Sequence, residues 1–469
     1  MNFRLHQRWP LYTTIARIGL VVALVGFAGM GCASVSKSAG HAEVSQLVQE
    51  RTGIPTRWDQ GSPEDQQVAR WLDESLRGGL TRERAVAIAL LNNPALQDAY
   101  EQLGISQADM VQAGLLSNPA IGGHVEFATS GSSRDVQFSL VQDFLDLFVL
   151  PARKRIAREQ FEADILRVAH QALETAAEVN KEVVATEAAV RLVQFRQAVV
   201  EATLGTATLA DKQLAAGNVN ELQEASESVV HAESVLDLAR EEMELLRHRE
   251  RVNRLLGLWG PHADWTLAEE LPAPPEKDLL LEHLETLAIS RRLDVDAARK
   301  QRLLVAHAVG LARSTRLFGR IEVGVDLHQF PDGPRVFGPS LVLELPIFDQ
   351  RQALIARLEA QERQAERRLT AVSVTARSEV RLSQAELLAA RQTVDQYREV
   401  VLPLRGRIVR QAQLHYNGML LGLPQLLRLK QDEVESQARY IAAVRDYWVA
   451  RADLERAVGG HIPTNEKQP

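Results

Sequence analysis

Hydrophobic and polar positions follow two different periods along the chain. In four short stretches the apolar residues recur at every second position, and in the long stretches between them they recur at spacings of three and four. The first period is typical of strands with one apolar face, and the second is typical of amphipathic helices. The sequence therefore predicts a mainly α fold with a small β part.

The four alternating stretches predict two β-hairpins. The first pair of strands surrounds the turn ATSGSSRD, and the second pair surrounds PDGP, a strong turn signal. Each strand is predicted to have roughly 9 to 11 residues, which is the length that a tilted strand needs to cross a bilayer. The same alternation is also typical of a half-buried soluble sheet. Because four strands cannot close a membrane barrel, a barrel would need several chains. The alternating apolar positions include Ile121, Val125, Phe127, Val136, Phe138, Leu140, Ile321, Val323, Val325, Leu327, Leu341, Leu343 and Leu345.

Long stretches without Gly or Pro predict unusually long helices. No Gly or Pro lies between Pro346 and Pro403, and a helix there would be roughly 80 Å long at about 1.5 Å per residue. A second stretch begins after Pro151 and lasts to Gly205. Its apolar residues recur at four-three spacing, which is typical of a coiled-coil seam. The seam positions are Val179, Val183, Thr186, Val190 and Val193.

The chain contains an internal duplication. LAAGNVNELQEASESVV, from Leu214, matches LHYNGMLLGLPQLLRLK, from Leu414, because each places a glycine turn before a long helix. The matched points lie about 200 residues apart, far beyond the solenoid periods of about 20 to 50 residues. We therefore predict a duplicated half, made of a helix, a β-hairpin and a long helical hairpin. The alternative is a chance likeness between helices rich in Ala, Glu and Arg.

The N-terminus has the features of an export signal. Arg4, Arg8 and Arg17 precede an apolar run, and small residues stand just before Cys32. This order resembles a bacterial lipoprotein signal in which Cys32 becomes lipidated, although Gly29 stands where Leu is usual. The alternative is an ordinary cleaved signal with an incidental cysteine.

These features divide the chain into six segments. A Pro-rich connector separates two repeats of similar plan. The predicted segments are a signal peptide with a lipidation cysteine (1–32), an N-terminal tether (33–80), the first repeat (81–260), the connector in an equatorial region (261–280), the second repeat (281–460) and a flexible tail (461–469).

Composition and motifs argue against several classes of function. The net charge of -7, with both signs interspersed, argues against a nucleic-acid surface. Cys32 is the only cysteine, so no disulfide can form within the chain. No GxSxG, Walker A, HExxH or paired-cysteine metal motif occurs, so we expect no enzyme, no cofactor and no bound catalytic metal. The scattered histidines are interpreted as surface or packed residues, and they include His124, His170, His231, His307, His328 and His415.

Several motifs taken together resemble the TolC-type outer-membrane factor family, in its lipoprotein branch. They are LTRERAVAIALLNNPAL, LPARKRIA (150–157), LELPIFDQRQALIA (343–356) and the region from Val401 through LHYNGM to LERAVGG. The resemblance covers nearly the whole mature chain. It implies a homotrimer in which duplicated long α-helical hairpins plus two β-hairpins build a twelve-stranded β-barrel in the outer membrane. The β-barrel would continue into a twelve-helix α-barrel in the periplasm, and the shared strands would leave no exposed edge.

The resemblance also implies three kinds of surface. The two helix turns would form a tip that contacts a periplasmic adaptor (membrane fusion protein) and an inner-membrane pump, and their glycines are expected to supply positive φ angles. The tip residues would be Ala216, Gly217, Asn218, Val219, Gly418, Met419, Leu420, Leu421, Gly422 and Leu423. The barrel lumen would carry Arg320, Glu322, Asp326 and Glu344. The face toward outer-membrane lipid would carry Val125, Phe127, Phe138, Ile321, Val323, Val325, Leu341 and Leu343.

Closure of the tip is predicted less specifically. Relatives often carry acidic residues just after the second turn, but this chain has Pro424, Gln425 and Leu427 there, so no acidic ring is expected. Tyr416 and Arg410 are predicted as possible gate residues. The apolar GMLLGL of this turn is expected to be a partner site, the alternative being burial against the neighbouring hairpin.

The sequence thus predicts a passive conduit in the outer membrane of a Gram-negative bacterium. It would serve tripartite efflux, of heavy-metal ions or drugs, or type I secretion, and its acidity would favour cations. One alternative is a periplasmic adaptor, which has one helical hairpin instead of two. The other is a structural coiled-coil scaffold, which would lack the paired alternating strands.

Overall fold

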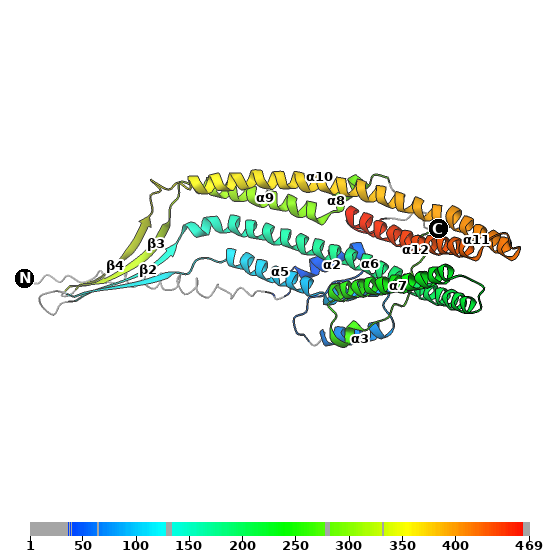
Figure 1. Cartoon of the computed structure of the whole chain (residues 1–469). Coiled ribbons are helices and arrows are strands. Elements are labelled where there is room, and N and C mark those ends of the chain that lie inside the picture. Colours follow the sequence, from blue (N-terminus) through cyan, green and yellow to red (C-terminus); the bar gives the residue numbers. More distant parts are fainter. Residues whose placement is uncertain are drawn as a thin grey trace, which may run out of the picture. The chain divides into compact units, whose positions relative to one another are not determined.

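The computed structural model describes residues 36, 38, 40–62, 65–127, 134–276, 282–330 and 333–462. The predicted signal peptide with Cys32 and most of the predicted tail lie outside these residues. From Ser38 onward the chain forms one compact unit. Figure 1 shows the strands at one end of this unit and the turns between the long helices at the other.

Helices dominate the described residues. The first part of the chain has α2 (His41–Thr52), α3 (Asp65–Arg77), α4 (Arg82–Asn92) and α5 (Pro94–Ala113), followed after two strands by the long hairpin α6 (Leu145–Ala215) and α7 (Glu221–Leu256). The second part has η1 (Gly260–Ala263), α8 (Leu284–Arg291), α9 (Leu293–Ser314), α10 (Gln352–Gln396), the π-helical turn η2 (Tyr397–Val401), α11 (Leu402–Asn417) and α12 (Leu423–Val458). Figure 1 shows α10 to α12 as the counterpart of α6 and α7.

Two prolines lie inside helices where the sequence predicted boundaries. The helix predicted to begin after Pro151 begins at Leu145, whose amide donates to the Asp143 carboxylate (2.9 Å), so Pro151 lies inside the helix. The helix upstream of Pro403 continues through that residue. Proline has no amide hydrogen, and the π-helical turn η2 just before it accommodates the missing bond, with the Leu402 amide reaching back to the Tyr397 carbonyl.

The strands form one four-stranded antiparallel sheet in the order β1 (Ala120–Phe127), β2 (Arg134–Asp143), β3 (Ile321–Gln329) and β4 (Arg335–Leu343). The two predicted hairpins are therefore joined by pairing between β2 and β3, where Leu140 lies opposite Val325. Leu345, predicted within the last strand, lies beyond it.

The core follows α6 along most of its length. Three clusters of buried side chains each include residues of this helix. The first cluster packs α6 against α2 and α5, the second against α3, α4 and α7, and the third against α8, α10 and α12. The predicted seam is buried at four of its five positions, and Val190 is half-buried. Each fully buried side chain of this size contributes about 1.5–3 kcal/mol to stability.

The segments predicted as tether and connector are packed against the helices. Val44 and Val48 of α2 are fully buried, so the predicted tether contains helices that belong to the core, a feature that the sequence analysis missed. Leu80 forms a parallel β-bridge with Leu267, and Trp265 of the connector is buried against α6 and α7.

Candidate functional site

The sheet has one apolar face that is exposed in the single chain. Residues paired directly across neighbouring antiparallel strands point to the same face. The register therefore places all eight residues of the predicted lipid face on one side, together with Ile121, Leu140, Leu327 and Phe337. Phe127 is 76% exposed and Phe337 62%. The same face carries Arg134, Gln142, Gln329 and Arg335 near the strand ends and is apolar between them. An exposed apolar surface of this kind is typical of contact with lipid or with a partner.

The opposite face is polar, and it carries the predicted lumen residues unevenly. Asp326 lies in the middle of β3 and pairs with Ser139 and Gly338. Glu322 lies near the start of β3, where the Arg320 guanidinium donates to its carboxylate at 3.2 Å.

The alternation predicted Arg320 and Glu344 within the strands. In the structure both residues lie just beyond the strand ends. The Arg320 amide donates to the Glu344 carboxylate (2.9 Å), and the Glu344 amide donates back to the Arg320 carbonyl (2.9 Å). Gly319 permits this close approach, because a Cβ there would lie 2.3 Å from the Glu344 carbonyl oxygen. Three of the four predicted lumen residues are thus gathered where the sheet meets the helices.

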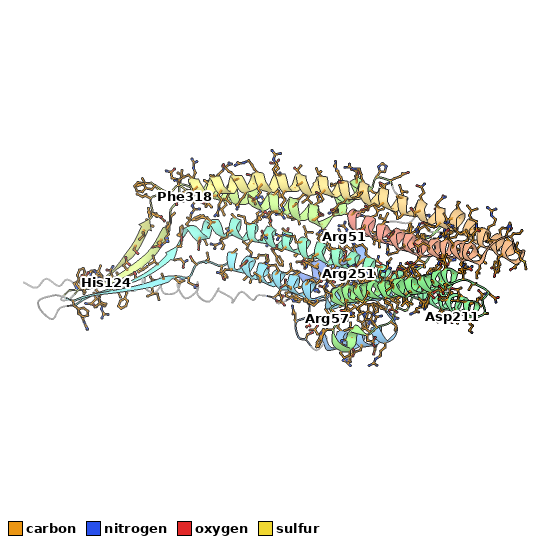
Figure 2. All side chains as sticks on the ribbon, viewed as in Figure 1. Arg51, Arg57, His124, Asp211, Arg251 and Phe318 are labelled. Carbon is orange, nitrogen blue, oxygen red and sulfur yellow. The ribbon has the colours of Figure 1, made fainter. Side chains whose placement is uncertain are left out.

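A belt of exposed aromatic and aliphatic side chains surrounds this junction. Phe348 is 93% exposed and Phe148 68%, and Phe148 contacts Phe144 edge to face at 5.3 Å. Figure 2 shows Phe318 at the same end of the helices. Aromatic belts of this kind are typical of membrane interfaces. The sequence analysis did not predict this belt, although the aromatic residues of VQDFLDLF (141–148) and LELPIFDQ (343–350) were a signal for it.

The two helix turns differ in backbone conformation. Gly217 has φ +73°, as expected, but Gly418 has φ -83°, and the positive φ of the second turn belongs to Met419 (+58°). The expectation that glycine supplies this angle in both turns is therefore wrong for the second turn. A methionine in this conformation is strained, since its Cβ lies close to the following carbonyl oxygen.

The second turn is exposed in the single chain. Met419 is 95% exposed and Leu420 77%, so these two side chains are not buried against a neighbouring hairpin of the same chain. Gly418 and Gly422 are also exposed, whereas Leu421 and Leu423 are half-buried. In the first turn Ala216, Gly217 and Asn218 are exposed and Val219 is half-buried.

A different ion pair joins α11 and α12, more than two helical turns away from the turn that connects them. In the described part of the chain no hydrogen bond or ion pair links Arg410 to Tyr416, the predicted gate residues. The guanidinium of Arg405 in α11 instead contacts the carboxylate of Asp432 in α12 at 2.8 Å. No spacing rule identifies this pair, because it joins two helices across a turn.

Two further observations concern the described residues. None of their helices is both long enough and apolar enough to cross a membrane. Their His, Cys, Asp and Glu side chains include no group of three or more placed to hold a metal ion.

Comparisons with known proteins agree with this arrangement. No protein-family model matches the chain. The cobalt-zinc-cadmium resistance protein CzcC of Cupriavidus metallidurans is 23% identical over 396 residues, which cover 81% of this chain and 90% of CzcC.

Solved structures share the fold at lower identity. The structure of CusC, described in connection with transmembrane channel formation, is 17% identical and covers 81% of this chain and 92% of its own, with a TM-score of 0.70. The Campylobacter jejuni CmeC outer membrane channel is 15% identical and covers 85% and 89%, with a TM-score of 0.72. At these identities the comparisons show that the chain shares the fold of the solved outer-membrane channels, which is the fold that the resemblance to the TolC-type family implies.

Proposed function

We propose that three copies of this chain form a passive conduit through the outer membrane of a Gram-negative bacterium and through part of the periplasm. The observation that carries the proposal is the open sheet. Its strand order leaves one edge of β1 and one edge of β4 without a partner strand within the described chain, while its apolar face is exposed. Sharing edges between copies closes such a sheet, and lipid covers its outer face.

The other surfaces fit the same arrangement. The belt around Phe148 and Phe348 would lie at the periplasmic interface of the outer membrane. The polar face with Asp326 would line a water-filled lumen. The exposed Met419 and Leu420 would contact a periplasmic adaptor that couples the conduit to an inner-membrane pump. We propose divalent metal ions as one substrate class, because CzcC is named for metal resistance. Drugs are the second class to test.

Cysteine pairs test the shared edges directly. Leu140→Cys with Val325→Cys joins register partners within one chain and serves as the control. Val125→Cys in β1 is combined in turn with Leu341→Cys, Pro339→Cys or Phe337→Cys in β4, all on the apolar face. Oxidation of one of these pairs should give cross-linked dimers and trimers and no larger species, whereas the control should stay monomeric on a denaturing gel. Monomers from every pair would contradict edge sharing.

Deletion of the gene tests transport. We expect reduced tolerance to Co²⁺, Zn²⁺ or Cd²⁺, or to members of a drug panel, with recovery when the gene is restored. Unchanged tolerance to every metal and drug would contradict an efflux role.

A further inference from the structure

The helix α7 carries an apolar stripe that no other part of the described chain covers. Its positions follow steps of three and four residues from Leu222 to Leu246, which is the a/d spacing of a coiled-coil helix. All eight positions are apolar and exposed in the single chain. Alanines occupy three of them, and the large side chains, which are 49–76% exposed, are Leu222, Val229, Leu236, Met243 and Leu246.

This stripe is a second seam on a helix that already has one partner. The other side of α7 packs on α6, where the Ser234 hydroxyl lies 2.8 Å from the Thr203 hydroxyl. At about 1.5 Å per residue, the exposed stripe is about 36 Å long. An exposed apolar surface of this length, with coiled-coil spacing, indicates a further helical partner.

A second uncovered face lies on η2 and α11. Val400, Leu404 and Ile408 recur at every fourth residue there, and each is 40–41% exposed. Within the unit, α7 packs on α6, α6 on α12 and α12 on α11. Figure 1 shows α7 and α11 on opposite sides of the unit. The row of four helices therefore has an uncovered apolar face at each end.

The two faces have opposite charge. Between Glu221 and Leu246, α7 has eight carboxylates and one arginine, whereas η2 and α11 together have four arginines and one glutamate. Charges beside a coiled-coil seam favour a partner helix of opposite sign.

Several of these charges have no partner of opposite sign within the described residues. On α7 they include Glu221, Glu233 and Glu242, which occupy e and g positions beside the stripe. On α11 they are Arg407 and Arg410, which are both exposed. Acidic side chains beside the first face and basic side chains beside the second therefore remain available to one another.

The two faces fit each other only between copies of the chain. Within one chain α6 and α12 separate α7 from α11, and no hydrogen bond or ion pair of the described residues joins α7 to η2 or α11. Two α7 helices from different copies would bring acidic flanks together, which is unfavourable. Because both turns lie at the same end of the unit, α7 and a neighbouring α11 would run antiparallel.

The distance from each turn gives the level at which the helices meet. Val229 lies twelve residues after Gly217, whereas Leu404 and Ile408 lie fourteen and ten residues before Gly418. Val229 of one copy therefore reaches the level between Leu404 and Ile408 of the next.

We propose that the apolar stripe of α7 packs antiparallel against the face of Val400, Leu404 and Ile408 on a neighbouring copy. The acidic flank of the stripe lies beside Arg407 and Arg410 of that copy. The inference rests on the proposed function for the three-copy assembly, and it adds which helices meet and the charge that selects them. Three such contacts join three helix rows into a closed ring.

Cysteine cross-linking of the full-length protein in detergent tests the contact. Val229→Cys is combined with Leu404→Cys or with Ile408→Cys, all at exposed positions, and the protein is oxidised. At least one pair should give dimers and trimers on a denaturing gel. The single variants, and the wild type with Cys32 alone, should stay monomeric. Dimers from Val229→Cys alone would show that two α7 helices meet, and a cross-link to a different protein would assign the stripe to another partner, so either result would overturn the inference.

Charge reversal tests the selection of the partner. Arg407→Glu with Arg410→Glu, added to the cross-linking pair, should slow oxidation about tenfold at low salt. Added salt should slow oxidation of the parent pair and speed that of the variant, because screening weakens an attraction in the first and a repulsion in the second. Arg367→Glu with Arg368→Glu is the matched control, since it reverses two exposed charges in α10 far from the face, and it should leave the rate unchanged. An identical salt response of parent and variant would overturn selection by charge.

The sheet-edge cysteine pairs separate this inference from the proposed function. Trimers from the sheet edges together with monomers from both α7–α11 pairs would contradict only the helix contact. Monomers from both sets of pairs would contradict the three-copy assembly itself.

Discussion

A charge placed on either face of the sheet should have opposite consequences at the same depth. Val325 is the central residue of β3, lies on the apolar face and is 43% exposed. Val141 in β2 lies opposite Gly324, the neighbour of Val325 in sequence, and belongs to the polar face. The substitutions Val325→Arg and Val141→Arg therefore change the same residue type at nearly the same position along the strands.

The expected difference follows from the surroundings of each side chain. An arginine that faces lipid at the middle of a membrane-spanning strand costs about 2–4 kcal/mol, whereas one that faces the lumen stays hydrated. Because each 1.4 kcal/mol is a factor of ten, Val325→Arg should lower the folded-to-unfolded ratio by about 30- to 700-fold. Val141→Arg should change it by much less.

Denaturant unfolding of the protein in phospholipid vesicles measures this difference. The loss of β-structure and the shift of the folded band on a gel both monitor the unfolding. Equal destabilisation by the two arginines would refute the assignment of the apolar face to lipid. Greater destabilisation by Val141→Arg would reverse the two faces.

Three further predictions concern the tip and the equatorial helices. Met419→Gly should relieve the positive φ of Met419 and stabilise the turn by about 1 kcal/mol in thermal unfolding, yet it should weaken adaptor binding in a pull-down; unchanged binding would remove Met419 from the contact. Arg405→Ala breaks the contact with Asp432 between α11 and α12, so the open probability in planar bilayers should rise, and an unchanged value would show that this pair does not hold the tip closed. Burial raises the pKa of the Glu455 carboxyl above its ordinary 4.5, against the opposing effects of Arg451 and His461. Its protonated form is therefore favoured by folding, so its contribution to the free energy of unfolding is present at acid pH and is lost as the pH rises through the folded pKa. Glu455→Gln should raise the unfolding free energy at neutral pH and flatten its pH dependence, and a steeper dependence would contradict the assignment.

The periodic parts of the fold were predictable because their physical signals are strong. Alternation, as at Val323 and Val325, indicates a strand with one apolar face. Four-three spacing, as at Val179 and Val183, indicates a helix with one apolar face, and both patterns continue over many residues. Strand ends were less predictable, since the alternation continues through Arg320 and Leu345 although the chain leaves the sheet there. The ends are defined by the register of the structure, in which Ile321 opposite Leu343 is the last pair of β3 and β4.

The surfaces depend on contacts that sequence spacing does not encode. The Arg405–Asp432 pair, for example, joins two helices across a turn. The left-handed conformation of Met419 was also unpredictable, because two glycines stood nearby as better candidates.

The most direct test of the central claim is the size of the detergent-extracted protein together with its conductance in a planar bilayer. We predict a trimer that opens a wide, cation-preferring pore. A water-soluble monomer that gives no current would contradict the conduit and would return the adaptor and scaffold alternatives to consideration.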